Sequence, residues 1–118
     1  MLNQKKLDTN LINAVEKISG PNFWVTETAF SADNQIVNKN SYFAFENVNI
    51  AKAGYTPLAV ASIRIKNATN AGINNTYCNL HSFELINNNL TIIGRNNNME
   101  DNAKIQITVQ ILYKKNSL

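Results

Sequence analysis

The chain has 118 residues, of which 44% are hydrophobic and 16% are charged, and its formal net charge is +3. A chain of this length makes one domain with a single core. Its apolar share is too high and its net charge too low for a disordered protein, and its composition is neither collagen-like nor disulfide-rich.

The N-terminal residues predict one short helix over residues 7–19. Asp8 or a neighbouring side chain caps this helix, and Ser19-Gly20-Pro21 ends it because proline cannot continue a helix. An apolar seam for packing against other copies is formed by Leu7, Leu11, Ala14 and Ile18. A competing stripe that instead docks on the protein's own domain is formed by Leu11, Val15 and Ile18. We therefore expect a helical segment for oligomerisation or docking at 1–20, followed by an antiparallel β domain over 21–118.

From residue 22 onward the apolar period changes to two, which is typical of strands. Strand-like segments follow at 23–30, 42–48, 58–66, 76–86, 90–95 and 105–113. Between the fourth and fifth of these, Asn87-Asn88-Asn89 predicts a tight hairpin, because asparagine tolerates a positive φ better than most residues.

Two of these segments predict which residues share a face. In the third, Ala59, Ala61, Ile63 and Ile65 share one face, and the other holds Leu58, Val60, Ser62, Arg64 and Lys66. The last segment has the clearest alternation. Its predicted core face holds Ile105, Ile107, Val109, Ile111 and Tyr113, and its outer face holds Lys104, Gln106, Thr108, Gln110 and Lys114.

Short polar connections join all these strands, so the sheets must be antiparallel, because parallel pairs need long crossovers. Two sheets packed face to face bury both sets of apolar faces. We therefore predict an all-β fold, an antiparallel β-sandwich or jelly-roll-like domain preceded by one short N-terminal helix.

The inventory of reactive side chains excludes most chemistry. Cys78 is the single cysteine, and His81 is the single histidine, so neither a disulfide within the chain nor a zinc site of the usual types can form. No glycine-rich phosphate loop, nucleophile elbow or HExxH motif occurs. We expect a non-enzymatic protein with no catalytic, cofactor-binding or metal-binding residues. His81 is predicted as a packed strand residue and Cys78 as a small apolar filler.

Two polar regions have alternative interpretations. The loop Asn96–Asn102 offers oxygen ligands that suit calcium, but it lacks the alternating acidic pattern of a calcium loop, and a solvated hairpin loop is the simpler interpretation. An aromatic platform for sugars, built from Phe23, Trp24, Tyr55 and Tyr77, competes with ordinary core and interface packing of the same rings.

Partners and location follow from charge and hydropathy. The basic residues are spread along the chain, with doublets only at Lys5-Lys6 and Lys114-Lys115, and they do not interleave with aromatic residues, so no nucleic acid is expected. No run approaches 18 apolar residues, and Met1-Leu2 is followed by polar residues and not by an apolar stretch, so we expect neither a membrane span nor a signal peptide.

Three features together resemble one family. They are the Gly54-Tyr55-Thr56-Pro57-Leu58 turn into a strand, the hairpin with asparagine-rich loops, and the closing strand Ile105–Lys115. They are similar to the small β-rich C-terminal domains of phage tail-fibre and minor structural proteins from viruses of low-GC bacteria. The resemblance covers about residues 48–118. In that family the domain is usually the tip of a longer chain, and here it is nearly the whole sequence, which favours an accessory subunit such as a head fibre, capsid decoration or tail appendage.

The resemblance implies a structural or attachment protein of a phage particle, located in the virion and made in the host cytoplasm. Expected partners are further copies of the chain, with a homotrimer favoured, other virion proteins, and a host surface glycan. The alternative is a free-standing carbohydrate-binding or lectin-like module.

Overall fold

The computed structural model describes residues 23–67 and 77–116, and this part of the chain is all-β with no helix. The predicted helix at 7–19, with its seam Leu7, Leu11, Ala14 and Ile18, lies outside the described residues. The six strands are β1 (Trp24–Val37), β2 (Ser41–Asn49), β3 (Tyr55–Asn67), β4 (Cys78–Ile86), β5 (Asn89–Asn96) and β6 (Ala103–Lys115). The number and order of the predicted strands are confirmed.

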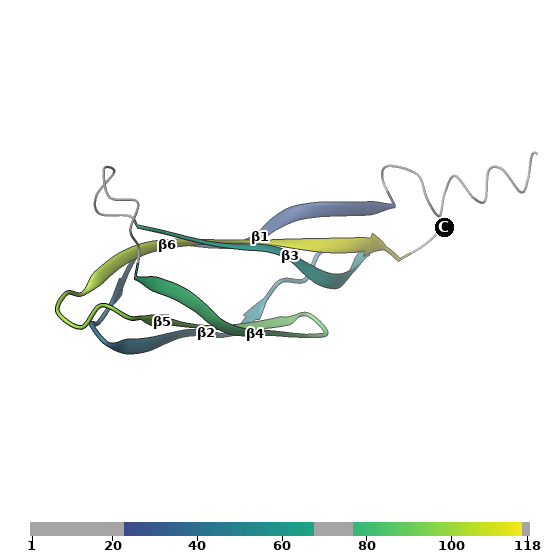
Figure 1. Ribbon diagram of the computed structural model, residues 1–118. Helices are drawn as coiled ribbons and strands as arrows, with labels where there is room; N and C mark the ends of the chain where they lie inside the picture. Colours follow the sequence, from purple (N-terminus) through teal and green to yellow (C-terminus); the bar gives the residue numbers. More distant parts are fainter. Residues whose placement is uncertain (1–22, 68–76, 117–118) are drawn as a thin grey trace, which may run out of the picture.

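The strands form two antiparallel three-stranded sheets that lie one above the other (Figure 1). Sheet A has the order β1-β6-β3, and sheet B has the order β2-β5-β4. In each sheet a strand from the C-terminal half is central, so β5 and β6 are the only described strands paired on both sides. These central strands carry the strictest alternation of buried and accessible residues.

The main core lies between the two central strands. Every inward residue of β6 from Ile105 to Tyr113 is at most 2% exposed, which confirms the predicted core face of this strand. From sheet B, Leu90 and Ile92 are completely buried against it. A second, smaller cluster at one end of the sheets contains Val37, Cys78 and Ile105. The flanking strands close the core with partly buried residues, namely Val25, Phe30, Phe45, Val60, Ile63, Ile65 and Leu85.

A bulge in a flanking strand corrects one of the predicted faces. A register shift in β3 between Val60 and Ser62 places Val60 opposite Ile111 on the core face, whereas strict alternation had grouped it with Ser62 on the other. A shift in β4 between Leu80 and Ser82 has a similar effect. It puts Leu80 and Phe83 on the same side of sheet B, opposite Gly94 and Ile92, whereas strict alternation would place them on opposite faces. An extra residue in one strand exchanges the two faces beyond it, which a period-two pattern cannot anticipate.

Asparagine takes the strained backbone positions. Among the described residues, the only non-glycine residues with positive φ are Asn34, Asn40, Asn47 and Asn87. Asn87 begins the predicted β4–β5 hairpin, and Asn47 lies in the bulge of β2 between Phe45 and Val48. The short polar side chain of asparagine makes this left-handed conformation less costly than it is for other side chains.

One end of the molecule is held together by a buried asparagine. We call it the Asn96 end, formed by the β1–β2 connection at 38–40 and the β5–β6 connection at 97–102. Asn96 is 0% exposed. Its amide nitrogen Nδ2 donates to the carbonyls of Val37, Asn38 and Asp101 at 3.2–3.3 Å, and its Oδ1 accepts from the backbone N–H of Asn98 at 2.9 Å. A single side chain thus joins both connections.

Candidate functional site

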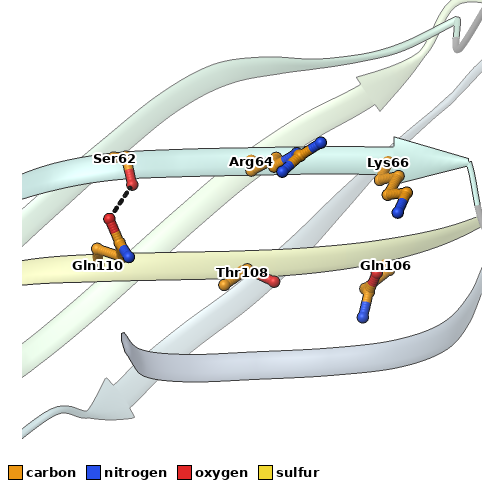
Figure 2. Close-up of a pocket in the computed structure, with 6 residues that line it drawn as sticks. All are labelled: Ser62, Arg64, Lys66, Gln106, Thr108 and Gln110. Atoms are coloured by element: carbon orange, nitrogen blue, oxygen red, sulfur yellow. Dashed lines mark hydrogen bonds between the residues drawn. The ribbon is translucent and has the colours of Figure 1, made fainter. Parts of the chain in front are cut away.

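The outward face of sheet A carries a groove lined only by polar side chains from β3 and β6. The groove has a volume of about 320 Å³ and is lined by Ser62, Arg64, Lys66, Gln106, Thr108 and Gln110. We call it the polar groove. Its residues face one another in three cross-strand pairs, Ser62 with Gln110, Arg64 with Thr108, and Lys66 with Gln106 (Figure 2). The inward neighbours of the same strands are the core residues, so burial of one face aims the other outward.

Bulges on both sides of Gln110 shape this face. In β3 the register shift lies between Val60, which pairs with Ile111, and Ser62, which pairs with Gln110. In β1 the shift lies between Thr28, which pairs with Gln110, and Phe30, which pairs with Val109. Both flanking strands therefore exchange faces beside the same residue of β6. Bulges re-aim side chains and are frequent next to functional sites. Here they place Ser62 and Thr28 on the outer face, on either side of Gln110.

Two hydrogen bonds fix the amide side chains of the groove. Ser62 Oγ donates to Gln110 Oε1 at 3.1 Å, the bond drawn in Figure 2. Gln106 Nε2 donates to Asp33 Oδ1 of β1 at 2.7 Å. After these bonds, Gln110 still presents both N–H groups of its amide, and Gln106 still presents its carbonyl oxygen. The groove thus has an oriented donor at one end and an oriented acceptor at the other.

Two cations stand side by side along the β3 wall of the groove. Arg64 and Lys66 are exposed, and neither forms an ion pair or hydrogen bond with any residue in 23–67 or 77–116. A guanidinium has five N–H donors and an ammonium has three, so donors greatly outnumber acceptors in the groove. Among the described residues, Asp33 is the one carboxylate that accepts a hydrogen bond from a groove residue, and that residue is Gln106. This arrangement suits a ligand rich in acceptor oxygens and negative charge.

The predicted aromatic platform is not assembled. Trp24 lies opposite Lys114 on the outer face of sheet A and is 42% exposed, and its ring packs edge-on against Phe23 at 5.1 Å. Phe23 is buried. Tyr55 starts β3 at the same end but packs against the core, and Tyr77 lies at the Asn96 end, where its carbonyl accepts from the N–H of Asn97. Trp24 alone therefore remains as an aromatic contact on the face that holds the polar groove.

The single cysteine and histidine have ordinary surroundings. Cys78 is buried in the smaller core cluster, and this burial raises the pKa of its thiol, which opposes formation of the reactive thiolate. His81 is exposed and packs edge-on against Tyr42 at 5.2 Å on the outer face of sheet B. Strict alternation would group it with Phe83 and Leu85, but the bulge between Leu80 and Ser82 separates it from them.

In the loop weighed as a calcium site, the amide oxygens of two asparagines are used internally. Asn98 Oδ1 accepts from the N–H groups of Glu100 and Asp101 at 2.9 and 3.1 Å, and Asn102 Oδ1 accepts from the N–H of Lys39 at 2.9 Å. Within residues 23–67 and 77–116, no group of three or more histidine, cysteine, aspartate or glutamate residues is placed to hold a metal ion.

The groove residues were visible in the sequence only as outward positions. Alternation placed Gln106, Thr108 and Gln110 on one face of β6 and Ser62, Arg64 and Lys66 on one face of β3. The alternation does not show that β3 pairs with β6, because the choice of partner and the register between strands far apart in sequence depend on the whole core. The signal that points to the groove is polar alternation in two strands, one of them with consecutive outward cations.

Comparison of the chain with protein-family models, with curated proteins and with solved structures found no match in any of the three. In the part of the chain that the structure describes, no helix is long and apolar enough to cross a membrane.

Proposed function

We propose that the protein is a non-enzymatic attachment protein of a phage particle, and that the polar groove of sheet A binds an anionic surface polysaccharide. The phage assignment rests on the family resemblance of residues 48–118. The binding role rests on one observation: Arg64 and Lys66 lie unpaired among the described residues, in a groove whose other walls offer oriented amides and hydroxyls.

The winding of the strands supports the structural side of this proposal. Successive strands β1 to β4 alternate between sheets A and B, while β5 and β6 return to pair with β2 and β1. We interpret this nesting of β2–β5 inside β1–β6 as a jelly-roll-like sandwich, a plan found in viral capsid and lectin domains. A rigid two-layer domain of this kind holds an outer sheet face in a fixed shape, which suits recognition of an extended chain.

A polysaccharide fits the groove better than a nucleic acid. The rows of side chains repeat about every 7 Å along the strands and offer hydroxyl and amide groups that match sugar hydroxyls. Nucleic acid binding without sequence preference relies on aromatic side chains that stack on bases, and the six residues lining the groove include no aromatic ring. The two cations then select polysaccharides that carry carboxylate, sulfate or phosphate groups.

Affinity electrophoresis and calorimetry with three polymers test the proposal: polygalacturonate, neutral dextran and single-stranded oligothymidylate. We expect binding to polygalacturonate alone. The double variant Arg64→Gln/Lys66→Gln should lose about tenfold or more in affinity, because hydrogen bonds to charged groups contribute about 1.5–3 kcal/mol.

The matched control is Lys39→Gln/Lys115→Gln, which removes the same charge from exposed positions outside the groove. It should bind nearly as well as the unmodified protein. An equal loss of affinity in both double variants would show that the interaction depends only on net charge. Equal binding to dextran would show that the cations play no part, and tighter binding to oligothymidylate would show that the ligand is a nucleic acid and not a polysaccharide. Mass spectrometry of purified phage particles tests the virion location separately.

A second function, that of a homo-oligomeric structural subunit, is favoured by the exposed side chains of β4. Leu80 and Phe83 face the core side of sheet B, opposite Gly94 and Ile92, yet they are 40% and 50% exposed. Ile86 at the end of the strand is also exposed. Because β4 is an edge strand with an unpaired row of backbone groups, association with another copy covers both the edge and these side chains.

Light scattering at micromolar concentration tests the oligomer. We propose a trimer, with a mass near three times 13.2 kDa. Leu80→Ser/Phe83→Ser should weaken the assembly, whereas Ile36→Ser, which alters an exposed apolar residue on the outer face of β1, should not. A mass near 13.2 kDa that does not change on dilution contradicts self-association.

A further inference from the structure

A second cluster of ligand-type side chains lies on the outer face of sheet B, on a different sheet from the polar groove. It combines residues from all three strands, Tyr42 of β2, Arg95 of β5 and His81 of β4. Tyr42 and Arg95 are direct cross-strand partners, and the guanidinium carbon lies 4.6 Å from the centre of the tyrosine ring. The ring of His81 meets the same tyrosine edge-on at 5.2 Å.

The guanidinium of Arg95 is fixed in place by two asparagine side chains. Its Nε donates to Asn97 Oδ1 at 3.1 Å, and its Nη2 donates to Asn40 Oδ1. Both asparagines are themselves anchored through the backbone, since the N–H of Asn40 donates to the carbonyl of Asn98 at 2.8 Å and the N–H of Asn97 to that of Tyr77 at 2.9 Å. Stacking and hydrogen bonds together leave this arginine little freedom to lose on binding a ligand.

The fixed guanidinium keeps both its charge and most of its donors. Two of its five N–H groups are used, so three remain. Its partners are neutral amides, and it forms no ion pair with a carboxylate in residues 23–67 or 77–116. A planar guanidinium with free N–H groups matches the geometry of a carboxylate.

We propose that Tyr42, His81 and Arg95 form a carboxylate-binding site. Arg95 binds the two carboxylate oxygens, the imidazole of His81 adds a hydrogen bond at the side, and the exposed part of the Tyr42 ring contacts the carbon skeleton that carries the acid. Two sources share this chemistry, an acidic sugar and the C-terminal carboxylate of a peptide. The site stands independently of the polar groove, because it uses the other sheet and other residues.

Titration of the ¹⁵N-labelled protein, followed by NMR, tests this site with four probes: D-glucuronate, N-acetyl-L-alanine, D-glucose and inorganic phosphate. We expect saturable shifts of the Arg95 side-chain Nε–H and of the Tyr42 and His81 backbone resonances with at least one of the two carboxylates. A response to glucuronate alone identifies an acidic sugar, a response to N-acetyl-L-alanine alone identifies a peptide terminus, and a response to both identifies a general carboxylate site. A response to neither carboxylate, an equal response to glucose, or a stronger response to phosphate overturns the proposal.

The matched variants are Arg95→Lys and Lys115→Arg, which exchange the two kinds of cation at the site and at an exposed position outside both proposed sites. Arg95→Lys keeps the charge but loses the planar donor pair, and it should weaken carboxylate binding about fivefold or more, whereas Lys115→Arg should leave it unchanged. Equal binding by Arg95→Lys contradicts the assigned geometry. Should Arg95→Lys unfold, the side-chain Nε–H shift in the unmodified protein still decides the matter.

Discussion

Removal of the Asn96 side chain should destabilise the whole domain, although the residue is neutral and lies at one end. Its Nδ2 carries two hydrogens that three carbonyls share at 3.2–3.3 Å, and its Oδ1 accepts one bond at 2.9 Å. This is equivalent to three hydrogen bonds, and at about 0.5–1.5 kcal/mol for each we expect Asn96→Ala to lower the free energy of unfolding by about 1.5–4.5 kcal/mol. Domains are stable by only about 5–15 kcal/mol, so this loss is large.

Urea unfolding followed by circular dichroism measures the change, and linear extrapolation gives the free energy in water. Asn38→Ala is the matched control, since this exposed asparagine lies in the same connection and its side chain forms no hydrogen bond within the described residues. A loss below about 0.5 kcal/mol for Asn96→Ala, typical of a surface substitution, would refute the reasoning.

The variant Asn96→Asp separates hydrogen bonding from packing, because it keeps the volume and the acceptor of the side chain. It replaces the donating amide with a carboxylate that faces three carbonyl oxygens. Repulsion raises the pKa of this carboxyl in the folded protein, so the variant should be least stable near neutral pH and should recover as the pH falls and the carboxyl takes up a proton. A variant that is equally stable at all pH values would show that the amide donors do not matter.

Three further predictions concern the core, the backbone and alkaline pH. Ile107→Ala, at a fully buried position of β6, should lower the free energy of unfolding in urea by about 2–5 kcal/mol. Thr108→Ala on the opposite face should lower it by less than about 1 kcal/mol. A loss below about 1 kcal/mol for Ile107→Ala would contradict the burial of this side chain. Asn47→Val should cost about 1–2 kcal/mol because φ is positive there, while Asn47→Gly should be nearly neutral, and equal effects would show that backbone strain is not the cause. The pKa of Lys52 is raised by its hydrogen bond to Glu27, and the pKa of Tyr113 is raised by burial, so the folded state holds both protons more tightly and stability should fall as the pH rises above about 10. Unfolding measured between pH 8 and 11 should show this fall, and it should be smaller in Tyr113→Phe, which also loses the 2.6 Å bond to the carbonyl of Ile50.

Sequence reasoning predicted the strands better than their arrangement. The closing strand was predicted almost completely, because its two faces differ at every position except Leu112 and β6 has neighbours on both sides that enforce this difference. The hairpin at Asn87 could be predicted equally well, since its turn residues and its flanking strands are adjacent in the sequence. Val60 was placed on the wrong face because its position depends on a bulge that local pattern does not encode.

The candidate sites could be predicted less well from the sequence, because they depend on which strands are neighbours in each sheet. The polar groove requires that β3 and β6 be neighbours, and the carboxylate site requires that β2, β5 and β4 be neighbours in that order. These pairings join residues as far apart as Asn40 and Arg95, so they follow from packing of the whole core and not from any local motif. His81 could be recognised as a strand residue, but its contact with Tyr42 follows from sheet order alone.

The bulges of sheet A change its outer face more than its core. β6 keeps a regular register, whereas β1 and β3 each have an extra residue beside Gln110, so the irregularity is confined to the strands at the edges of sheet A. The core accepts this because Val60 and Phe30 still turn inward beyond the shifts. The outer face changes more, since Ser62 and Thr28 come to lie on either side of Gln110. Deletion of Ala61, the extra residue between Val60 and Ser62, should therefore remove this bulge while Ser62 keeps its pairing with Gln110. The variant should fold and keep its polysaccharide binding, as measured by circular dichroism and calorimetry. Loss of binding in a folded variant would show that the bulge itself is required.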